Sequence, residues 1–132
     1  MKKIFLIIFA FVLFISCRNE QEEMLKTDQF VGTWNWVSTN GGIGNINETP
    51  SSTGKTVSMI FTNDNKYSIV ENNKTINEGT YKTYLEVTNT DHVQRVFIDF
   101  SNYPDKAVRS VTPTELHLYD DVADGLNYIY SK

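Results

Sequence analysis

Residues 30–38 constrain the fold most. They alternate with the period of a β-strand, and they contain the largest aromatic side chains of the protein. Both tryptophans of the protein, Trp34 and Trp36, share one face with Phe30 at the period-2 spacing of a β-strand. A strand with so much aromatic surface on one side must bury that side. We therefore expect this face to found the hydrophobic core, and the rest of the chain to pack against it.

Short segments of alternating apolar and polar residues follow, and clusters of turn-forming residues separate them. The expected strands are residues 30–38, 55–62, 66–71, 74–87, 93–100, 106–111, 115–119 and 126–131. Because the connections are short, neighbours in sequence should pair as an antiparallel meander. Eight such strands close most economically into a barrel, since closure removes exposed sheet edges. We predict an all-β fold, an eight-stranded antiparallel up-and-down β-barrel, with a two-sheet sandwich as the alternative.

Three features of the connections add detail to this barrel. Residues 39–54 are dominated by Gly, Asn, Ser, Thr and Pro and form the longest predicted loop, which we expect to lie over one mouth of the barrel. The pair Asn72-Asn73 predicts a tight hairpin turn, and residues 102–105 predict a turn around Pro104. Gly79, in the middle of the longest strand, predicts a kink or bulge.

The N-terminal residues have the pattern of an export signal. Lys2 and Lys3 precede an apolar run of residues 4–15, which is shorter than the roughly 20 residues that span a bilayer. Cys17 follows directly and is the only cysteine, so no disulfide can form within the chain.

A lone cysteine after such a run and the small residue Ser16 resembles the lipobox of bacterial lipoproteins. The resemblance implies a signal peptide over residues 1–16, a lipid such as palmitate on Cys17, and attachment to the membrane through that lipid. Residues 17–29 would form a polar tether before the barrel domain of residues 30–132. Acidic residues after the cysteine resemble a sorting signal of some Gram-negative lipoproteins, so we expect an outer-membrane lipoprotein of the cell envelope that faces the periplasm or the surface.

Charge and motif content exclude several functions. The chain carries a net charge of −4 and has no cluster of Lys or Arg, which argues against nucleic-acid binding. Residues 53–56 look like the end of a phosphate-binding loop but lack its first glycine. His92 and His117 lie far apart in the sequence, and Asp120, Asp121 and Asp124 lack the alternating spacing of a calcium loop, so we expect no metal site. No nucleophile motif or paired carboxylates stand out, so we expect neither a cofactor nor an enzyme.

The strand pattern and the segments between the strands resemble those of a known protein family. Gly32-Thr33-Trp34 resembles the Gly-x-Trp signature of lipocalins. The glycine-rich segment 41–44, the Thr-Pro…Thr-Gly segment 49–54 and the terminal tyrosine strand resemble the lipocalin-like domains of small Gram-negative bacterial lipoproteins. In lipocalins an arginine on the last strand packs over the signature tryptophan; the terminal basic residue here is Lys132. The chain is shorter than a typical lipocalin and lacks its C-terminal helix.

Aromatic side chains suggest two functions. In the first, a lipocalin-like barrel binds a small apolar or amphipathic ligand. The ligand-binding residues of that hypothesis are Trp34, Trp36, Tyr67, Tyr81 and Tyr128. In the alternative, large side chains fill the barrel completely, and its loops contact a protein partner of the cell envelope. Interior volume separates the two, because a barrel filled along its whole length has no room for a ligand.

Overall fold

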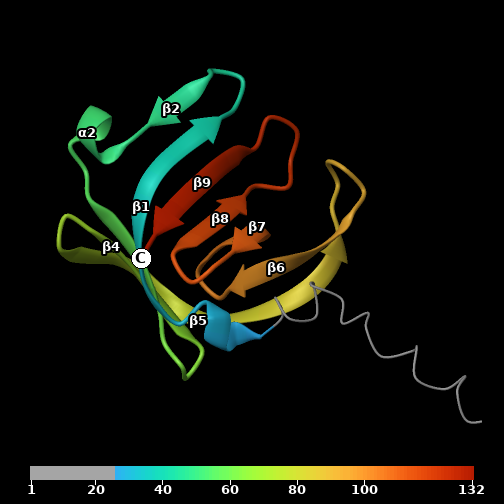
Figure 1. The fold of residues 1–132 in the computed structure, drawn as a ribbon, viewed down its shortest axis with the longest axis horizontal. Coiled ribbons are helices and arrows are strands. Elements are labelled where there is room, and N and C mark those ends of the chain that lie inside the picture. The colour runs from blue at the N-terminus through green and yellow to red at the C-terminus, as the bar shows by residue number, and fades with distance from the viewer. Residues whose placement is uncertain (1–25) are drawn as a thin grey trace, which may run out of the picture.

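The computed structural model describes residues 26–132, which form a closed antiparallel β-barrel (Figure 1). The elements in chain order are the short 3₁₀ helix η1 (Thr27–Gln29), β1 (Gly32–Gly41), β2 (Ile46–Glu48), the short helix α2 (Pro50–Thr53), β3 (Val57–Phe61), β4 (Lys66–Glu71), β5 (Lys74–Val87), β6 (Gln94–Phe100), β7 (Tyr103–Val111), β8 (Glu115–Tyr119) and β9 (Leu126–Ser131). Successive strands from β3 to β9 pair with each other, and β1 pairs with both β3 and β9. The β1–β9 pairing closes the sheet, which confirms the eight-stranded up-and-down barrel and excludes the sandwich.

Strand bounds follow the sequence pattern closely where alternation is strong. The strands predicted over residues 66–71, 74–87, 115–119 and 126–131 have these bounds in the structure. Asn72 and Asn73 both adopt positive φ angles, 49° and 65°, so the predicted tight turn between β4 and β5 is confirmed. The turn predicted around Pro104 is wrong, because Tyr103, Pro104 and Asp105 already belong to β7.

The connection between β1 and β3 is more ordered than the predicted loop of residues 39–54. Its first part continues β1 and returns as β2, which pairs only with the last residues of β1. Its second part is α2, where Thr49 and Ser52 cap the first turn reciprocally and Gly54 ends the helix with a left-handed φ of 69°. Figure 1 shows β2 and α2 beside the C-terminal end of β1, at one end of the barrel.

The bulge predicted at Gly79 is wrong, and the glycine is needed there for a different reason. It pairs regularly with Tyr67, whereas the register of the β4–β5 pair shifts between Ile69 and Val70. A Cβ on Gly79 would clash with the hydroxyl oxygen of Ser101 and would lie 3.0 Å from the side-chain nitrogen of Asn102. Glycine is therefore needed at this position because the turn between β6 and β7 packs directly on β5.

A continuous core fills one half of the barrel. Its buried side chains are Phe30, Trp34, Met59, Phe61, Tyr67, Ile69, Tyr81, Val96, Ile98, Phe100, Val108, Leu116, Leu118 and Tyr130. Trp34 and Trp36 both belong to the interior side of β1, which confirms the inward face predicted for residues 30–38. Aromatic rings meet edge to face in this half, as in the Phe61–Tyr81 and Tyr67–Phe100 pairs, whose centroids are 4.8 Å apart.

The N-terminal end of β1 closes the barrel. Trp34 is fully buried, and its indole N–H donates a hydrogen bond of 2.7 Å to the carbonyl oxygen of Phe30. The Lys132 ammonium lies 4.3 Å from the centroid of the Trp34 ring and donates to the carbonyl oxygen of Val31 at 2.8 Å. A basic side chain from the end of the chain thus covers the tryptophan of the Gly-x-Trp segment. A cation held over an indole face is a favourable arrangement.

Among residues 26–132, no helix is long and apolar enough to span a membrane. The signal peptide expected over residues 1–16 and the lipid-bearing Cys17 lie outside the described residues, as does most of the tether expected over residues 17–29. The described end of that segment forms η1, and the Tyr81 hydroxyl donates a hydrogen bond of 3.3 Å to the carbonyl oxygen of Thr27. This contact holds η1 against the closed end of the barrel.

Candidate ligand-binding site

The opposite half of the barrel contains a cavity of about 430 Å³ that opens to solvent. Its lining residues are Trp36, Thr39, Glu48, Thr53, Lys55, Val57, Ile69, Glu71, Ile76, Asn77, Tyr103, Tyr128 and Tyr130. They come from β1, β3, β4, β5, β7 and β9 of the barrel and from the β2–α2 connection, which supplies Glu48 and Thr53. A volume in the range of 300–1,000 Å³ is typical of small-molecule sites.

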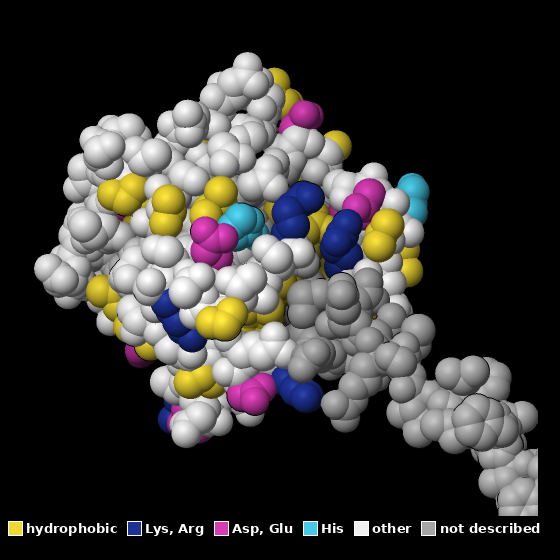
Figure 2. Space-filling view, viewed as in Figure 1, with side chains coloured by type: hydrophobic (Ala, Val, Ile, Leu, Met, Phe, Trp, Pro, Cys, Tyr) yellow, Lys and Arg dark blue, Asp and Glu magenta, His cyan; other side chains and the backbone are white. Residues whose placement is uncertain are grey.

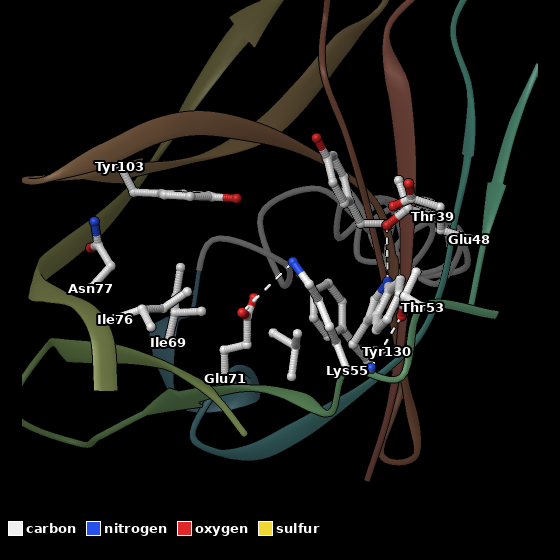
Figure 3. A pocket seen from close by; sticks show the side chains of 13 residues that line it. Thr39, Glu48, Thr53, Lys55, Ile69, Glu71, Ile76, Asn77, Tyr103 and Tyr130 are labelled. Carbon is white, nitrogen blue, oxygen red and sulfur yellow. Dashed lines mark hydrogen bonds and ion pairs between the residues drawn. The ribbon is translucent and has the colours of Figure 1, made fainter. Parts of the chain in front are cut away.

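Two opposing walls of the cavity differ in chemistry. Val57, Ile69 and Ile76 form an aliphatic wall on β3, β4 and β5. Tyrosines from β7 and β9, the strands across the barrel in the strand order, form the other wall. In Figure 3 the ring of Tyr103 extends into the cavity, with its hydroxyl directed toward the middle. The cavity is thus amphipathic, with tyrosine hydroxyls on one wall and aliphatic side chains on the other.

The rim of the cavity carries three charged groups. Lys55, just before β3, and Glu71, at the end of the neighbouring strand β4, form an ion pair with 3.7 Å between Nζ and Oε1, as the dashed line in Figure 3 shows. Their side chains are 54% and 30% exposed, so solvent screens this ion pair. Glu48, an exposed residue of β2, adds a second carboxylate. The rim therefore holds two acidic groups and one basic group.

A buried ion pair supports the tyrosine wall from behind. Lys106, on β7, is 5% exposed and contacts the carboxylate of Asp120. Its ammonium lies 4.6 Å from the centroid of the Tyr128 ring and 5.2 Å from that of Tyr103. The Tyr128 hydroxyl donates a hydrogen bond of 2.9 Å to the second carboxylate oxygen of Asp120. The pair thus fixes the orientation of two tyrosines that line the cavity.

The hydroxyls of the tyrosine wall remain protonated at neutral pH. Burial, followed by the hydrogen bond to Asp120 and then by the negative charge of that residue, raises the pKa of Tyr128 well above its ordinary value. Burial is also the main cause that raises the pKa of Tyr130 and of Tyr103, with Asp120 adding to the effect in both. All three groups therefore act as neutral O–H donors.

Two of the five aromatic residues predicted to bind a ligand line the cavity. Trp36 lies on its wall, where its indole N–H donates to the Thr39 hydroxyl at 2.9 Å, and Tyr128 lies on the tyrosine wall. Trp34 and Tyr81 lie in the packed core at the closed end instead. Tyr67 is 2% exposed and reaches the cavity only indirectly, since its hydroxyl donates to the side chain of Asn77 at 2.6 Å.

The sequence prediction missed several lining residues. Tyr103 falls within the turn predicted over residues 102–105, and neither Tyr103 nor Tyr130 is among the predicted ligand-binding residues. Lys106 carried a usable signal, because it shares the inward face of β7 with Val108. Its partner Asp120 carried no signal beyond belonging to a group of acidic residues without the spacing of a calcium loop. The pairing depends on a bulge between Val108 and Ser110 that the residue pattern does not reveal.

The remaining candidate metal ligands do not come together in the described structure. Within residues 26–132, no group of three or more His, Cys, Asp or Glu side chains is placed to hold a metal ion. Asp121 instead accepts hydrogen bonds from the backbone N–H groups of Asn89 and Thr90 at 2.7 and 3.1 Å. Figure 2 shows basic and acidic side chains interspersed on the visible face of the described residues.

Comparisons of the chain with protein-family models, with curated proteins and with solved structures found no match.

Proposed function

We propose that this protein is a membrane-anchored, lipocalin-like lipoprotein that binds a small apolar or amphipathic ligand in the open half of its barrel. One observation carries the proposal: the half-filled barrel leaves a cavity of about 430 Å³ lined mainly by aliphatic and aromatic side chains. The lysine over the tryptophan at the closed end supports the likeness to lipocalins.

A titration with apolar ligands tests the binding proposal. Trp36 lines the cavity, so a saturable change in tryptophan fluorescence on adding retinoids, fatty acids or their esters is the expected result. Val57→Phe adds an aromatic ring to the aliphatic wall and should abolish the change. Ile60→Phe adds the same ring on the same strand, but on the outward face, and should preserve it.

The outcomes of this titration separate the two functions considered above. Equal loss of binding in both variants would point to damaged folding rather than a filled cavity, and circular dichroism of each variant controls for that damage. No response to any ligand by the wild-type protein would refute the binding proposal and favour a domain that contacts an envelope protein through its loops.

The membrane anchor is proposed from the sequence. Cys17, preceded by the apolar run and Ser16, would carry the acyl chains, and several chains on one cysteine hold a protein firmly at a bilayer. Palmitate labelling of the wild-type protein, lost in Cys17→Ser, is the expected result, with recovery in the outer-membrane fraction. Labelling that persists in Cys17→Ser would contradict this part of the proposal.

A further inference from the structure

The cavity holds polar groups whose hydrogen bonds are already made and others that are free for a ligand. Asn77 accepts from the Tyr67 hydroxyl and donates to the carbonyl oxygen of Asn102 at 2.8 Å. The Thr39 hydroxyl accepts from Trp36, and the Tyr128 hydroxyl donates to Asp120. Asn77 and the Tyr128 O–H are therefore occupied within the protein, and the Thr39 hydroxyl is occupied as an acceptor.

Two hydroxyls of the tyrosine wall have no such partner. Within the described residues, neither the Tyr103 hydroxyl nor the Tyr130 hydroxyl makes a hydrogen bond, although both residues line the cavity. Each is a neutral donor in surroundings that raise its pKa. A donor on an otherwise apolar wall favours a ligand that presents a hydrogen-bond acceptor to it.

The charges around the cavity argue against an anionic acceptor. The charge of Lys106, behind the tyrosine wall, is already neutralised by its contact with Asp120. At the rim, Lys55 is paired with Glu71, and Glu48 adds a further negative charge. A carboxylate at the tyrosine wall would lose its hydration without gaining an unpaired cation. A carboxylate at the rim would have to compete with Glu71 for Lys55.

We infer that the cavity selects an uncharged single-chain amphiphile whose carbonyl head group accepts hydrogen bonds from Tyr103 and Tyr130 while its apolar chain lies against Val57, Ile69 and Ile76. Figure 3 shows the hydroxyl of Tyr103 directed into the space in front of Ile69 and Ile76, where such a chain would lie. This inference rests on the proposed function and deepens it, because it names the class of ligand for the same cavity.

Three probes with the same apolar chain and different heads test the inference: glycerol monolaurate, lauric acid and dodecylamine, which are uncharged, anionic and cationic at neutral pH. The affinity of the purified protein for each is measured by calorimetry below the critical micelle concentration. We expect the uncharged ester to bind at least about 10-fold more tightly than the acid, because the acid pays an additional desolvation cost.

Variants assign the head-group contacts. Tyr103→Phe and Tyr130→Phe should each weaken ester binding about 3- to 10-fold, the usual range for one lost hydrogen bond. Tyr84→Phe is the matched control, because Tyr84 stacks on Phe97 outside the barrel and bonds Asp105 rather than the cavity. Glu48→Gln combined with Glu71→Gln should raise the affinity for the acid relative to that for the ester, because it removes two negative charges from the rim.

The outcomes test the binding function and the class of ligand separately. If none of the probes binds but the wider ligand panel still gives a saturable response, the inference about ligand class is overturned; if neither gives a response, the proposed function itself fails. Tighter binding of the acid or the amine than of the ester would overturn the inference about ligand class and leave the binding function standing. Preference for the ester that survives both cavity Tyr→Phe changes would overturn the assignment of these two hydroxyls.

Discussion

Removal of the Asp120 carboxylate should destabilise the barrel more than any other single change around the cavity. The Lys106 side chain that contacts it is 6% exposed, so Asp120→Ala leaves an ammonium group in the interior without its carboxylate. Loss of one partner from a buried ion pair costs about 3–5 kcal/mol. We expect a value near the lower end, about 3 kcal/mol, because the Asp120 side chain is itself 25% exposed and two tyrosine rings still contact the ammonium.

Removal of the Lys106 ammonium should lower the free energy of unfolding less than removal of the Asp120 carboxylate does. Lys106→Met places an apolar side chain of similar length against the two rings, and Asp120 keeps both partial access to solvent and the hydrogen bond from Tyr128. We expect a loss of about 1 kcal/mol for this variant. The double variant removes both charges, so its loss should be about 2 kcal/mol, well below the sum of the two single losses.

Urea denaturation followed by circular dichroism measures all four free energies of unfolding. Similar slopes of the unfolding free energy against urea concentration would show that the variants unfold from comparably folded states. Additivity of the two single losses to within about 0.5 kcal/mol would refute the reasoning, because independent sites behave in that way. A loss in Asp120→Ala no larger than in Lys106→Met would do so as well.

Three further variants test contacts elsewhere in the barrel. Lys132→Met removes the ammonium above Trp34 and should cost about 1 kcal/mol in thermal denaturation; an unchanged melting temperature would contradict the stabilising role of this contact. Gly79→Ala forces a Cβ against the turn between β6 and β7 and should cost about 2 kcal/mol in urea, whereas a neutral result would mean that the turn moves freely. The hydrogen bond and charge of Arg95 hold the pKa of Asp91 at about 2, below its ordinary value of 3.8. The Asp91 carboxylate therefore contributes fully to stability at pH values above its ordinary pKa of 3.8, and this contribution is lost as the pH falls toward about 2. Asp91→Asn should flatten the pH dependence of stability between these two pH values. An acid profile identical to the wild type would contradict this.

Alternation along the strands predicted which face each residue occupies but not its height in the barrel. Trp34 and Trp36 share the inward face of β1, as their spacing indicated. They nevertheless lie in different layers: Trp34 is packed at the closed end, and Trp36 lines the cavity. Height depends on the stagger between paired strands and on bulges such as the one between Trp36 and Ser38. For this reason the fold was predictable, and the membership of the site was predictable only in part.

Short elements escaped prediction for a different reason. The α2 helix carries clear terminal signals, with Thr49 as its cap, Pro50 in its first turn and Gly54 after its end. Four residues are too few to show helical periodicity, so the residue pattern predicts a loop here. Terminal signals without a periodic segment between them therefore deserve weight when the connection that contains them is long.

The central claim is that the open half of the barrel binds a ligand while the closed half is solid core. The two tryptophans report on these halves separately, because the indole N–H of Trp36 is bonded to Thr39 beside the cavity and that of Trp34 to Phe30 at the closed end. The most direct test is a nitrogen–proton NMR spectrum recorded while glycerol monolaurate is added. The account predicts a saturable shift of the Trp36 indole signal and a stationary Trp34 signal. A stationary Trp36 signal, or a shift confined to Trp34, would contradict it.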